Sequence, residues 1–494
     1  METGLFVTML FSQALFAKSF DFEPLGWFNE GAEAIAQTQD GGYMIAGACA
    51  GTYIAPLLLR LDPSGNPVWV RLVTLGGNAG SILRDQGGNY VVAGSHSYAP
   101  THSKILVFKM DTSGTFYWAR YFGLVTSRES AGSIVQTTDG GYVVSGRIFV
   151  TDTPYPWPDS MYYFVLKMDP LGNFLWARRF GRTWDDELGC YIAQTMDGNL
   201  VVAGHEEETP SDPLGITVIK MDAEGNPVWM KGFGWRNVVA SITGTADGGC
   251  VLAGSSSGRI LILKLNPEGE LSWARRFSVM GADRAESVIQ ASDGGIVVAG
   301  VTGNSQDLLV FKIDPSGNLS WARTFKEFGN GYSSARLQVI QTTDGGYAVT
   351  GYPINISILK INEDGDYPGC ADTCWPVVDT PEIQFFPPAY YAPWTPTISS
   401  PSPTLEDAPG FVVTDLCPSI VAEDTDTYTS RTLALLPVPS GFWVIGYSGP
   451  VKIYDSAARL VLSREIEGKT LIGPLKSGVY LVVGKRQRAM VAVR

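Results

Sequence analysis

The chain has 494 residues, of which 45% are hydrophobic and 11% aromatic, and its formal net charge is −13. This composition describes a well-packed globular protein, and the 56 glycines and 30 prolines indicate the many turns of all-β architecture. Lysines and arginines are scattered along the acidic sequence without forming a basic stripe. We therefore expect no nucleic-acid partner.

An apolar run extends from Leu5 to Ala17 at the start of the chain. It is too short to cross a bilayer and long enough for the core of a signal peptide. A buried β-strand is the alternative interpretation, because no basic residue precedes the run. We expect a signal peptide over residues 1–17, cleaved after Ala17, and hence an exported protein.

A two-part pattern then occurs seven times between Asp40 and Gly351. Each repeat has a turn of the Asp-Gly-Gly type followed by a short apolar segment. A longer apolar run, a turn of the Asp-Pro-x-Gly-Asn type and a Trp-Ala-Arg segment complete it. Self-similarity at a spacing of roughly 50 residues is typical of an array of supersecondary units. The first turns begin at Asp40, Asp85, Asp139, Asp197, Asp247, Asp293 and Asp344.

Each repeat carries four strand signals joined by hairpin turns. In the third repeat these are residues 133–137, 142–145, 163–168 and 174–180. Four antiparallel strands in each of seven repeats predict a seven-bladed β-propeller over residues 18–366. A β-solenoid is the competing fold, but its repeats are shorter and its strands are parallel.

The fourth strand of most repeats alternates a Trp, a cation and an aromatic residue, as in Trp176, Arg178 and Phe180. This spacing places all three side chains on one face of the strand. The stem of the cation lies between the two rings, and its charge discourages pairing at the outer edge. We interpret these tryptophans as scaffold residues.

The seventh repeat lacks its Trp segment, so another part of the chain must cover that edge. In an earlier repeat, Trp118 precedes Thr137 by 19 residues. The same count back from Thr38 gives Ser19. We therefore expect residues 19–23 to supply the outer strand of repeat 7 and close the ring.

Residues 367–430 are rich in Pro, Ser and Thr, which predicts an extended, semi-rigid linker. Its aromatic residues indicate that part of it packs against the propeller. Three cysteines in the repeats (Cys49, Cys190 and Cys250) are expected to be small buried side chains. The disulfide candidates lie in the linker, and their spacing leaves open which two pair: Cys370, Cys374 and Cys417.

Residues 431–494 contain five or more short apolar segments separated by Gly, Pro or Ser, which predicts a small Ig-like β-sandwich. Segments 451–455, 459–461 and 475–481 resemble the C-terminal sorting domain of type IX secretion cargo. The matching motif residues are Tyr454, Asp455, Gly478 and Tyr480. A generic Ig-like accessory domain is the alternative.

This resemblance implies a route of export. The repeats themselves look like those of secreted bacterial β-propeller proteins of unassigned function. The protein would fold in the periplasm, and its C-terminal domain would have the secretion machinery as its partner. It would then be released or attached to the cell surface.

In a propeller, the loops between second and third strands open on the same face as the crossings between repeats. These loops vary in length here, from residues 255–258 to residues 147–162, and such variation marks the face where function resides. Aromatic and carboxylate side chains there suit a carbohydrate, a peptide or a cation. Solvated loops without a ligand are the alternative. The candidate ligand-binding residues are Tyr98, Tyr155, Trp157, Trp184, Asp185, Asp186, His205, Glu206 and Trp235.

The chain has three histidines and no P-loop, dinucleotide or nucleophile motif, so we expect no metal and no cofactor. Two functions remain open. The first is a non-catalytic, monomeric, exported propeller that binds a glycan, peptide or protein at its loop face. The second is an exported carbohydrate-active enzyme, a glycosidase or lyase, that uses carboxylates there. The sequence favours binding.

Overall fold

A computed structural model describes the chain in segments, to which all structural statements below refer. No helix in these segments is long and apolar enough to cross a membrane. The described residues are 15–21, 28–50, 54–99, 102–123, 127–150, 160–183, 189–206, 215–235, 237–303, 307–326, 336–351, 356–367, 372–373, 377–379, 385–386, 391–393, 397–399, 405–407, 412–415, 434–438, 441–445, 449–455, 460–466, 470–472, 478–483 and 488–493.

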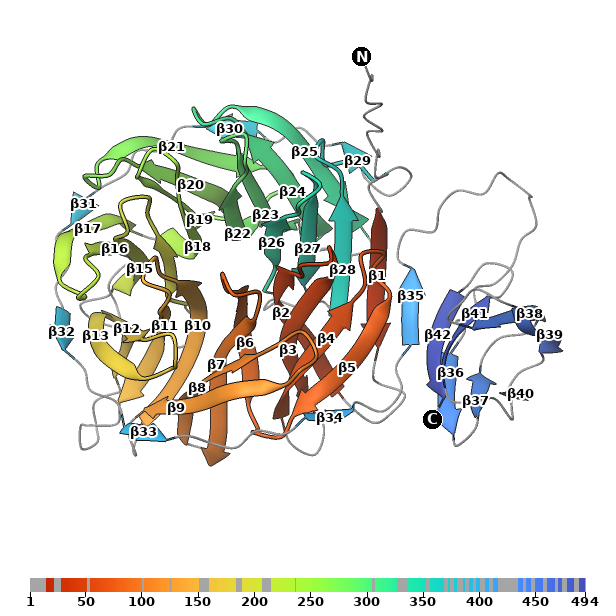
Figure 1. Cartoon of the computed structure of the whole chain (residues 1–494). Helices are drawn as coiled ribbons and strands as arrows, with labels where there is room; N and C mark the ends of the chain where they lie inside the picture. Colours follow the sequence, from red (N-terminus) through yellow and green to blue (C-terminus); the bar gives the residue numbers. More distant parts are fainter. Residues whose placement is uncertain are drawn as a thin grey trace, which may run out of the picture.

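The repeats fold as antiparallel sheets set radially around a common axis, which makes the molecule an all-β propeller (Figure 1). The first strand of each repeat is innermost. Repeats 1 to 3 form β2 (Phe28–Gln37), β3 (Tyr43–Ala50), β4 (Ile54–Leu61), β5 (Pro67–Val73), β6 (Asn78–Arg84), β7 (Tyr90–Ala99), β8 (His102–Met110), β9 (Phe116–Gly123), β10 (Ser127–Gln136), β11 (Tyr142–Val150), β12 (Ser160–Met168) and β13 (Phe174–Thr183).

The later repeats follow the same order of strands. Repeats 4 to 7 form β14 (Tyr191–Gln194), β15 (Leu200–Glu206), β16 (Gly215–Met221), β17 (Pro227–Trp235), β18 (Asn237–Gly244), β19 (Cys250–Ser256), β20 (Arg259–Leu265), β21 (Leu271–Ser278), β22 (Arg284–Gln290), β23 (Ile296–Thr302), β24 (Asp307–Ile313), β25 (Leu319–Phe325), β26 (Gln338–Gln341), β27 (Tyr347–Gly351) and β28 (Ile356–Ile361).

A cation from the third strand, buried in five of the seven repeats, fixes the first turn of each repeat. In repeat 3, the Oδ1 of Asp139 accepts hydrogen bonds from the Thr137 hydroxyl at 2.6 Å and the Gly141 N–H at 2.9 Å. Lys167 reaches the same carboxylate from the third strand at 2.8 Å, and its side chain is only 2% exposed. In repeat 2 the carboxylate stands two residues earlier, as Asp85. The seven pairs are Asp40–Arg60, Asp85–Lys109, Asp139–Lys167, Asp197–Lys220, Asp247–Lys264, Asp293–Lys312 and Asp344–Lys360.

The hydrophobic core lies between neighbouring sheets. The middle strands are apolar on both faces, and every residue of β16 is buried. Side chains of β19 and β20 pack against those of β23 and β24, which joins repeats 5 and 6. Burial on both faces explains why these strands lack the polar alternation of a surface sheet.

The outer-strand tryptophans connect one repeat to the next. The indole N–H of Trp176 donates to the Ala223 carbonyl in the second turn of repeat 4 at 2.9 Å. Its ring lies beneath Gly225, where an added Cβ would come within 2.8 Å. The Arg178 guanidinium lies 5.4 Å above the same ring. These contacts support the interpretation of the Trp residues as scaffold.

The N-terminal strand β1 (Phe16–Asp21) forms the fourth strand of repeat 7. It pairs antiparallel with β28, and Phe16 stands opposite Lys360. Trp321 stands opposite Lys312 in repeat 6, so Phe16 occupies the tryptophan position. The prediction that residues 19–23 form this strand is corrected: the observed strand starts three residues earlier, because 22 residues separate Phe16 from Thr38, against the 19 from Trp118 to Thr137.

The seam between repeats 7 and 1 uses the same contacts as the other junctions. The Phe16 ring lies beneath Gly65, and Lys18 donates to the Asn66 side chain at 2.7 Å. On the inner strands, Gln338 accepts a hydrogen bond from the Ile35 N–H at 2.6 Å. The ring is thus closed at both its inner and outer edges.

The segment after the repeats differs from the predicted linker, because it pairs with every repeat rather than packing in part. Its short strands, which we call the belt, follow the rim in reverse order of the repeats (Figure 1). The Asp379 carboxylate of the belt also pairs with Arg276 of β21 at 2.6 Å. The belt strands are β29 (Asp372–Thr373) on β25, β30 (Val377–Asp379) on β21, β31 (Phe385–Phe386) on β17, β32 (Tyr391–Pro393) on β13, β33 (Thr397–Ser399) on β9, β34 (Leu405–Asp407) on β5 and β35 (Val412–Asp415) on β1.

The three cysteines of the repeats are buried, as the sequence predicts. Cys49, Cys190 and Cys250 are each 1% exposed and form no disulfide. The disulfide candidates Cys370, Cys374 and Cys417 lie outside the described residues, so their pairing stays a prediction.

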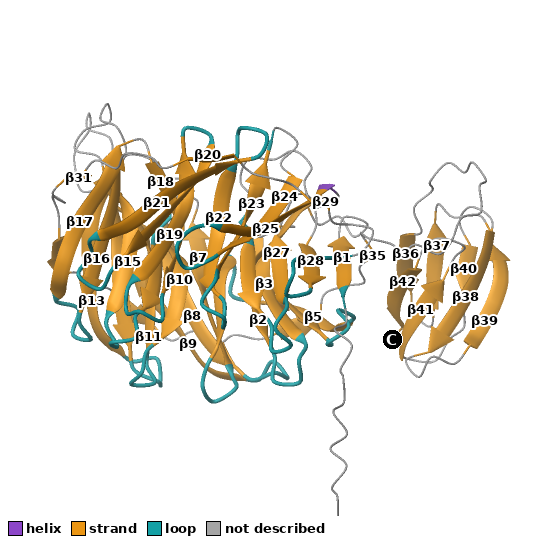
Figure 2. Ribbon diagram, turned by 90° about the horizontal axis from the view of Figure 1, so that it is seen from above, coloured by secondary structure: helices purple, strands orange, loops and turns teal. Residues whose placement is uncertain are grey.

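The last part of the chain forms two antiparallel sheets (Figure 2). Strand β42 of one sheet contacts β36 of the other. Of the sorting-motif residues, Asp455 stands opposite Tyr480, Tyr454 opposite Leu481, and Gly478 opposite Val493. The strands are β36 (Ala434–Val438), β37 (Gly441–Ile445) and β40 (Thr470–Ile472), then β39 (Leu460–Ile466), β38 (Gly449–Asp455), β41 (Gly478–Val483) and β42 (Arg488–Val493).

Candidate functional site

Most of the predicted ligand-binding residues fall where the structure gives no side-chain description. Tyr98 is the last residue but one of β7, and Glu206 and Trp235 end β15 and β17, but only the backbone of these three residues is described. The others lie outside the described residues: Tyr155, Trp157, Trp184, Asp185 and Asp186. Their role on the loop face stays a prediction.

The prediction that His205 binds a ligand is corrected, because its side chain is fully buried and faces the next repeat. Its Nε2 accepts a hydrogen bond from the Val239 N–H at 2.9 Å, and its Nδ1 lies 3.4 Å from the Tyr163 hydroxyl. Burial lowers the pKa of His205 to about 3, so the ring is neutral. It therefore holds repeats 3, 4 and 5 together and offers no contact to a ligand.

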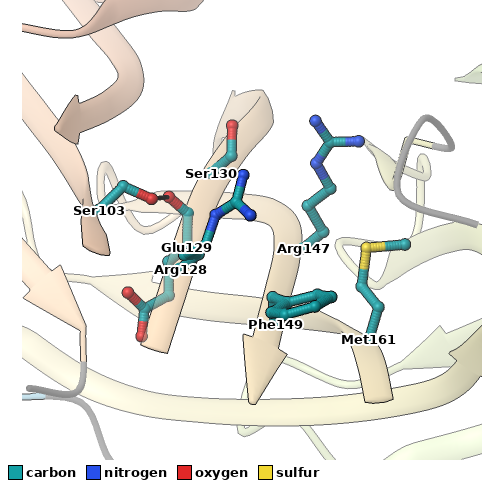
Figure 3. Close-up of a pocket in the computed structure, with 7 residues that line it drawn as sticks. All are labelled: Ser103, Arg128, Glu129, Ser130, Arg147, Phe149 and Met161. Atoms are coloured by element: carbon teal, nitrogen blue, oxygen red, sulfur yellow. Dashed lines mark hydrogen bonds between the residues drawn. The ribbon is translucent and has the colours of Figure 1, made fainter. Parts of the chain in front are cut away.

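A cavity of about 80 Å³ lies between repeats 2 and 3 on the loop face (Figure 3). It forms because β10 starts early and runs beside β8, where Arg128 and Ser103 make a parallel bridge. The Ser103 hydroxyl donates to the Glu129 carbonyl at 2.8 Å. The lining residues are Ser103, Arg128, Glu129, Ser130, Arg147, Phe149 and Met161.

The cavity combines positive charge with an apolar floor. Alternation along β10 places Arg128 on one side of the strand and the Glu129 carboxylate on the other, so this carboxylate points away from both guanidinium groups (Figure 3). Arg147 and Phe149 share a face of β11 for the same reason. The Arg128 guanidinium lies 5.6 Å from the Phe149 ring. Met161 is buried and completes the apolar wall.

A second group of polar side chains gathers near the axis, at the same end of the inner strands. We call it the axial cluster. Arg284 Nε contacts Glu286 Oε1 at 2.7 Å. Glu33 accepts a hydrogen bond from the Asn78 side chain at 3.2 Å and lies 3.8 Å from Arg336. The cluster consists of Glu33, Asn78, Tyr191, Arg284, Glu286 and Arg336.

β-Bulges explain why two glutamates belong to this cluster. The pairing of β2 with β3 skips Glu33, and the pairing of β22 with β23 skips Glu286. An extra residue in a bulge leaves the ladder, and its side chain is re-aimed. Repeats 2 and 3 have Gly80 and Gly132 at this position. Glutamate in place of glycine at a bulge is therefore the sequence signal for the cluster. None of the predicted ligand-binding residues belongs to the cluster.

Burial and neighbouring charges set the protonation of the cluster. Burial raises the pKa of Glu286, although Arg284 and Arg336 act in the opposite direction. Burial also raises the pKa of Tyr191, and the charges of Arg336 and Arg147 partly oppose this.

One donor in the cluster is unsatisfied. Within the described parts of the chain, the buried Nη2 of Arg284 has no hydrogen-bond partner. Such a group costs free energy unless water or a ligand supplies an acceptor. No three His, Cys, Asp or Glu side chains among the described residues are grouped to hold a metal ion.

Comparison with known proteins adds little beyond these observations. No family model matches the chain, and no curated protein matches it. Solved structures with weak similarity include a streptogramin B lyase, with 13% identity, a TM-score of 0.42 and coverage of 71% of this chain and 100% of the other. BamB from Moraxella catarrhalis has 13% identity, a TM-score of 0.35 and coverage of 67% and 85%. The α-L-arabinofuranosidase Arb93A from Fusarium graminearum has 7% identity, a TM-score of 0.40 and coverage of 71% and 98%.

Proposed function

We propose that this chain is an exported, seven-bladed β-propeller whose C-terminal unit is an Ig-like sorting domain. The seven sequence repeats and their four-stranded sheets support the blade count. The two packed sheets of residues 434–493 and the motif around Tyr454 and Gly478 support the sorting role. Recognition by the type IX machinery would deliver the protein to the cell surface or the medium.

We further propose that the propeller is a non-catalytic binding protein for a carboxylate-bearing ligand. The observation that carries this is the pair of guanidinium groups, Arg128 and Arg147, on a cavity floored by Phe149 and Met161. Guanidinium groups recognise carboxylates through paired, charge-assisted hydrogen bonds. The apolar floor would take the uncharged part of the same ligand.

The size of the cavity limits what enters it. One water molecule needs roughly 10–15 Å³ of cavity volume. A cavity of about 80 Å³ therefore accepts a group the size of one sugar unit or one amino-acid residue. The ligand would therefore present a terminal unit here and extend beyond the cavity.

Hydrolysis of a glycan is less well supported at this cavity. A glycosidase places two carboxyl groups on either side of the scissile bond, about 5 to 9.5 Å apart. Among the residues that line the cavity, Glu129 is the one carboxylate, and it points away from the guanidinium groups. The geometry therefore favours binding over the carbohydrate-active enzyme.

A binding screen with matched variants tests this function. The full chain would be applied to an array of neutral and uronic-acid glycans and to peptides with free C-terminal carboxylates. We expect Arg147→Ala to weaken capture of carboxylated ligands about 10-fold or more, because a charge-assisted hydrogen bond contributes roughly 1.5–3 kcal/mol. Arg275→Ala, on the outer rim of repeat 5, is the control. Equal capture by parent and Arg147→Ala would refute the proposal.

A further inference from the structure

The cavity and the axial cluster lie on the same face and adjoin along the inner strands. A Cβ added at Gly80 would meet Glu33 Oε2 of the cluster at 3.3 Å and the carbonyl oxygen of Ala131 at 2.9 Å. Ala131 belongs to β10, the strand that carries Arg128 at the cavity. A ligand that fills the cavity and extends along the start of β10 toward the axis therefore meets the axial cluster.

The cluster mixes cations with hydrogen-bond acceptors, which restricts the ligand. Arg284 and Arg336 attract an anion, and the Nη2 of Arg284 lacks an acceptor among the described residues. Glu33 and Glu286 accept hydrogen bonds from donors. A simple polyanion would be repelled by these carboxylates. A ligand with both carboxylates and hydroxyl groups satisfies the whole set.

We propose that the ligand of the cavity is an acidic oligosaccharide, with one uronate unit bound by Arg128 and Arg147 and a later unit bound at the axial cluster. There, Arg284 and Arg336 bind the second carboxylate, while Glu33 and Glu286 accept hydrogen bonds from sugar hydroxyls. This inference rests on the proposed binding function and adds a second subsite and a substrate class.

An acidic peptide is the competing ligand. A glutamate-rich peptide carries the same charges, but its side chains have no hydroxyl donors for Glu33 and Glu286. Tyr191, a half-buried aromatic residue of the axial cluster, also favours a sugar, because aromatic rings pack against the apolar faces of pyranose rings. The two ligand classes are distinguished directly in the test.

Calorimetric titration with oligogalacturonates of one to six units tests the second subsite. For the parent, we expect affinity to rise at least about 10-fold between the monomer and an oligomer that reaches the axial cluster. Arg284→Gln should abolish this gain. Neutral oligosaccharides and oligoglutamates of matched length are the ligand controls. An affinity that does not depend on length, or tighter binding of oligoglutamate, would overturn the inference.

Three further variants separate binding from folding and from the proposed function. Tyr191→Phe keeps the ring and should retain the length-dependent gain, whereas Tyr191→Leu, which removes the ring, should reduce the gain at an unchanged melting temperature. Arg336→Lys keeps the charge beside Glu33 at the seam, so it should fold and lose part of the gain. Failure of the inference alone would leave monomer binding that depends on Arg147. Failure of the proposed function would abolish the dependence on Arg147 itself.

Discussion

At the scale of single residues, the turn carboxylates are the feature that all repeats share. Burial alone would raise the pKa of Asp139, but hydrogen bonds from Lys167, Thr137 and the Gly141 N–H outweigh it and hold the pKa at about 2. Asp197 behaves alike, with a pKa of about 2. The turn carboxylates of the other repeats also have lowered pKa values.

These shifts predict how stability depends on pH. A carboxylate whose pKa is lower in the folded than in the unfolded protein stabilises the folded state. This stabilisation is complete at pH values above the unfolded pKa, near 4, and is lost as the pH falls to the folded pKa. Stability should thus decline between about pH 4 and pH 2, with seven turns losing their ion pairs together. Urea unfolding at several pH values measures this. Constant stability down to pH 2 would contradict the prediction.

Lys167→Met tests one of these turns alone. The substitution keeps the buried stem but removes the ammonium that binds Asp139 and Thr137. Since Asp139 is more than half exposed and regains water, we expect a loss of only about 1–2 kcal/mol in the free energy of unfolding. Lys231→Met on the outer strand of repeat 4 is the control. The variant should also flatten the acid transition, which a pure packing defect would not do.

At the scale of elements, the hairpins were predictable because each signal is local. Turns of the Asp-Gly-Gly and Asp-Pro-x-Gly-Asn types, separated by apolar runs, mark the strands of every repeat. The position of β1 was less predictable, because the spacing from Phe16 to Thr38 is set by a crossing that differs from the others. The belt was missed for a different reason: strands of two to four residues show no periodicity.

The position of β1 changes the expected end of the signal peptide. Cleavage after Ala17 would remove Phe16, which is 6% exposed and packs edge-on against Tyr43 at 5.6 Å. Cleavage after Ala14 would leave β1 intact, and it has small residues at the required places, Ser12 and Ala14. We therefore predict a mature protein that begins at Leu15. N-terminal sequencing of the exported protein decides between Leu15 and Lys18.

The candidate site shows the limit of prediction from sequence alone. The cavity lies on the face that carries the variable loops, but Arg128 and Arg147 line one cavity only because β10 starts early beside β8. The axial cluster likewise depends on bulges, which re-aim Glu33 of repeat 1 and Glu286 of repeat 6. His205 was misassigned because a loop-adjacent position does not reveal which way its side chain points.

At the scale of the whole molecule, both ends of the propeller chain meet on repeat 7. Strand β1 lies between β28 and β35, so each of its edges is paired. The belt reaches β35 only after it has followed the rims of the other six repeats. Every outer strand therefore has a partner along part of its length, which removes seven edges that would otherwise be open to intermolecular pairing.

Removal of the belt should expose these edges. We predict that a chain ending at Tyr367 forms soluble oligomers or aggregates, whereas a chain ending at Leu433, which keeps the belt and lacks the C-terminal unit, stays monomeric. Light scattering after size-exclusion chromatography measures the difference. The chain without the belt should also melt earlier, because β1 then keeps only its pairing with β28. If both truncated chains are monomeric and equally stable, the belt does not protect the edges, and its pairing with the rim serves only to position the C-terminal unit.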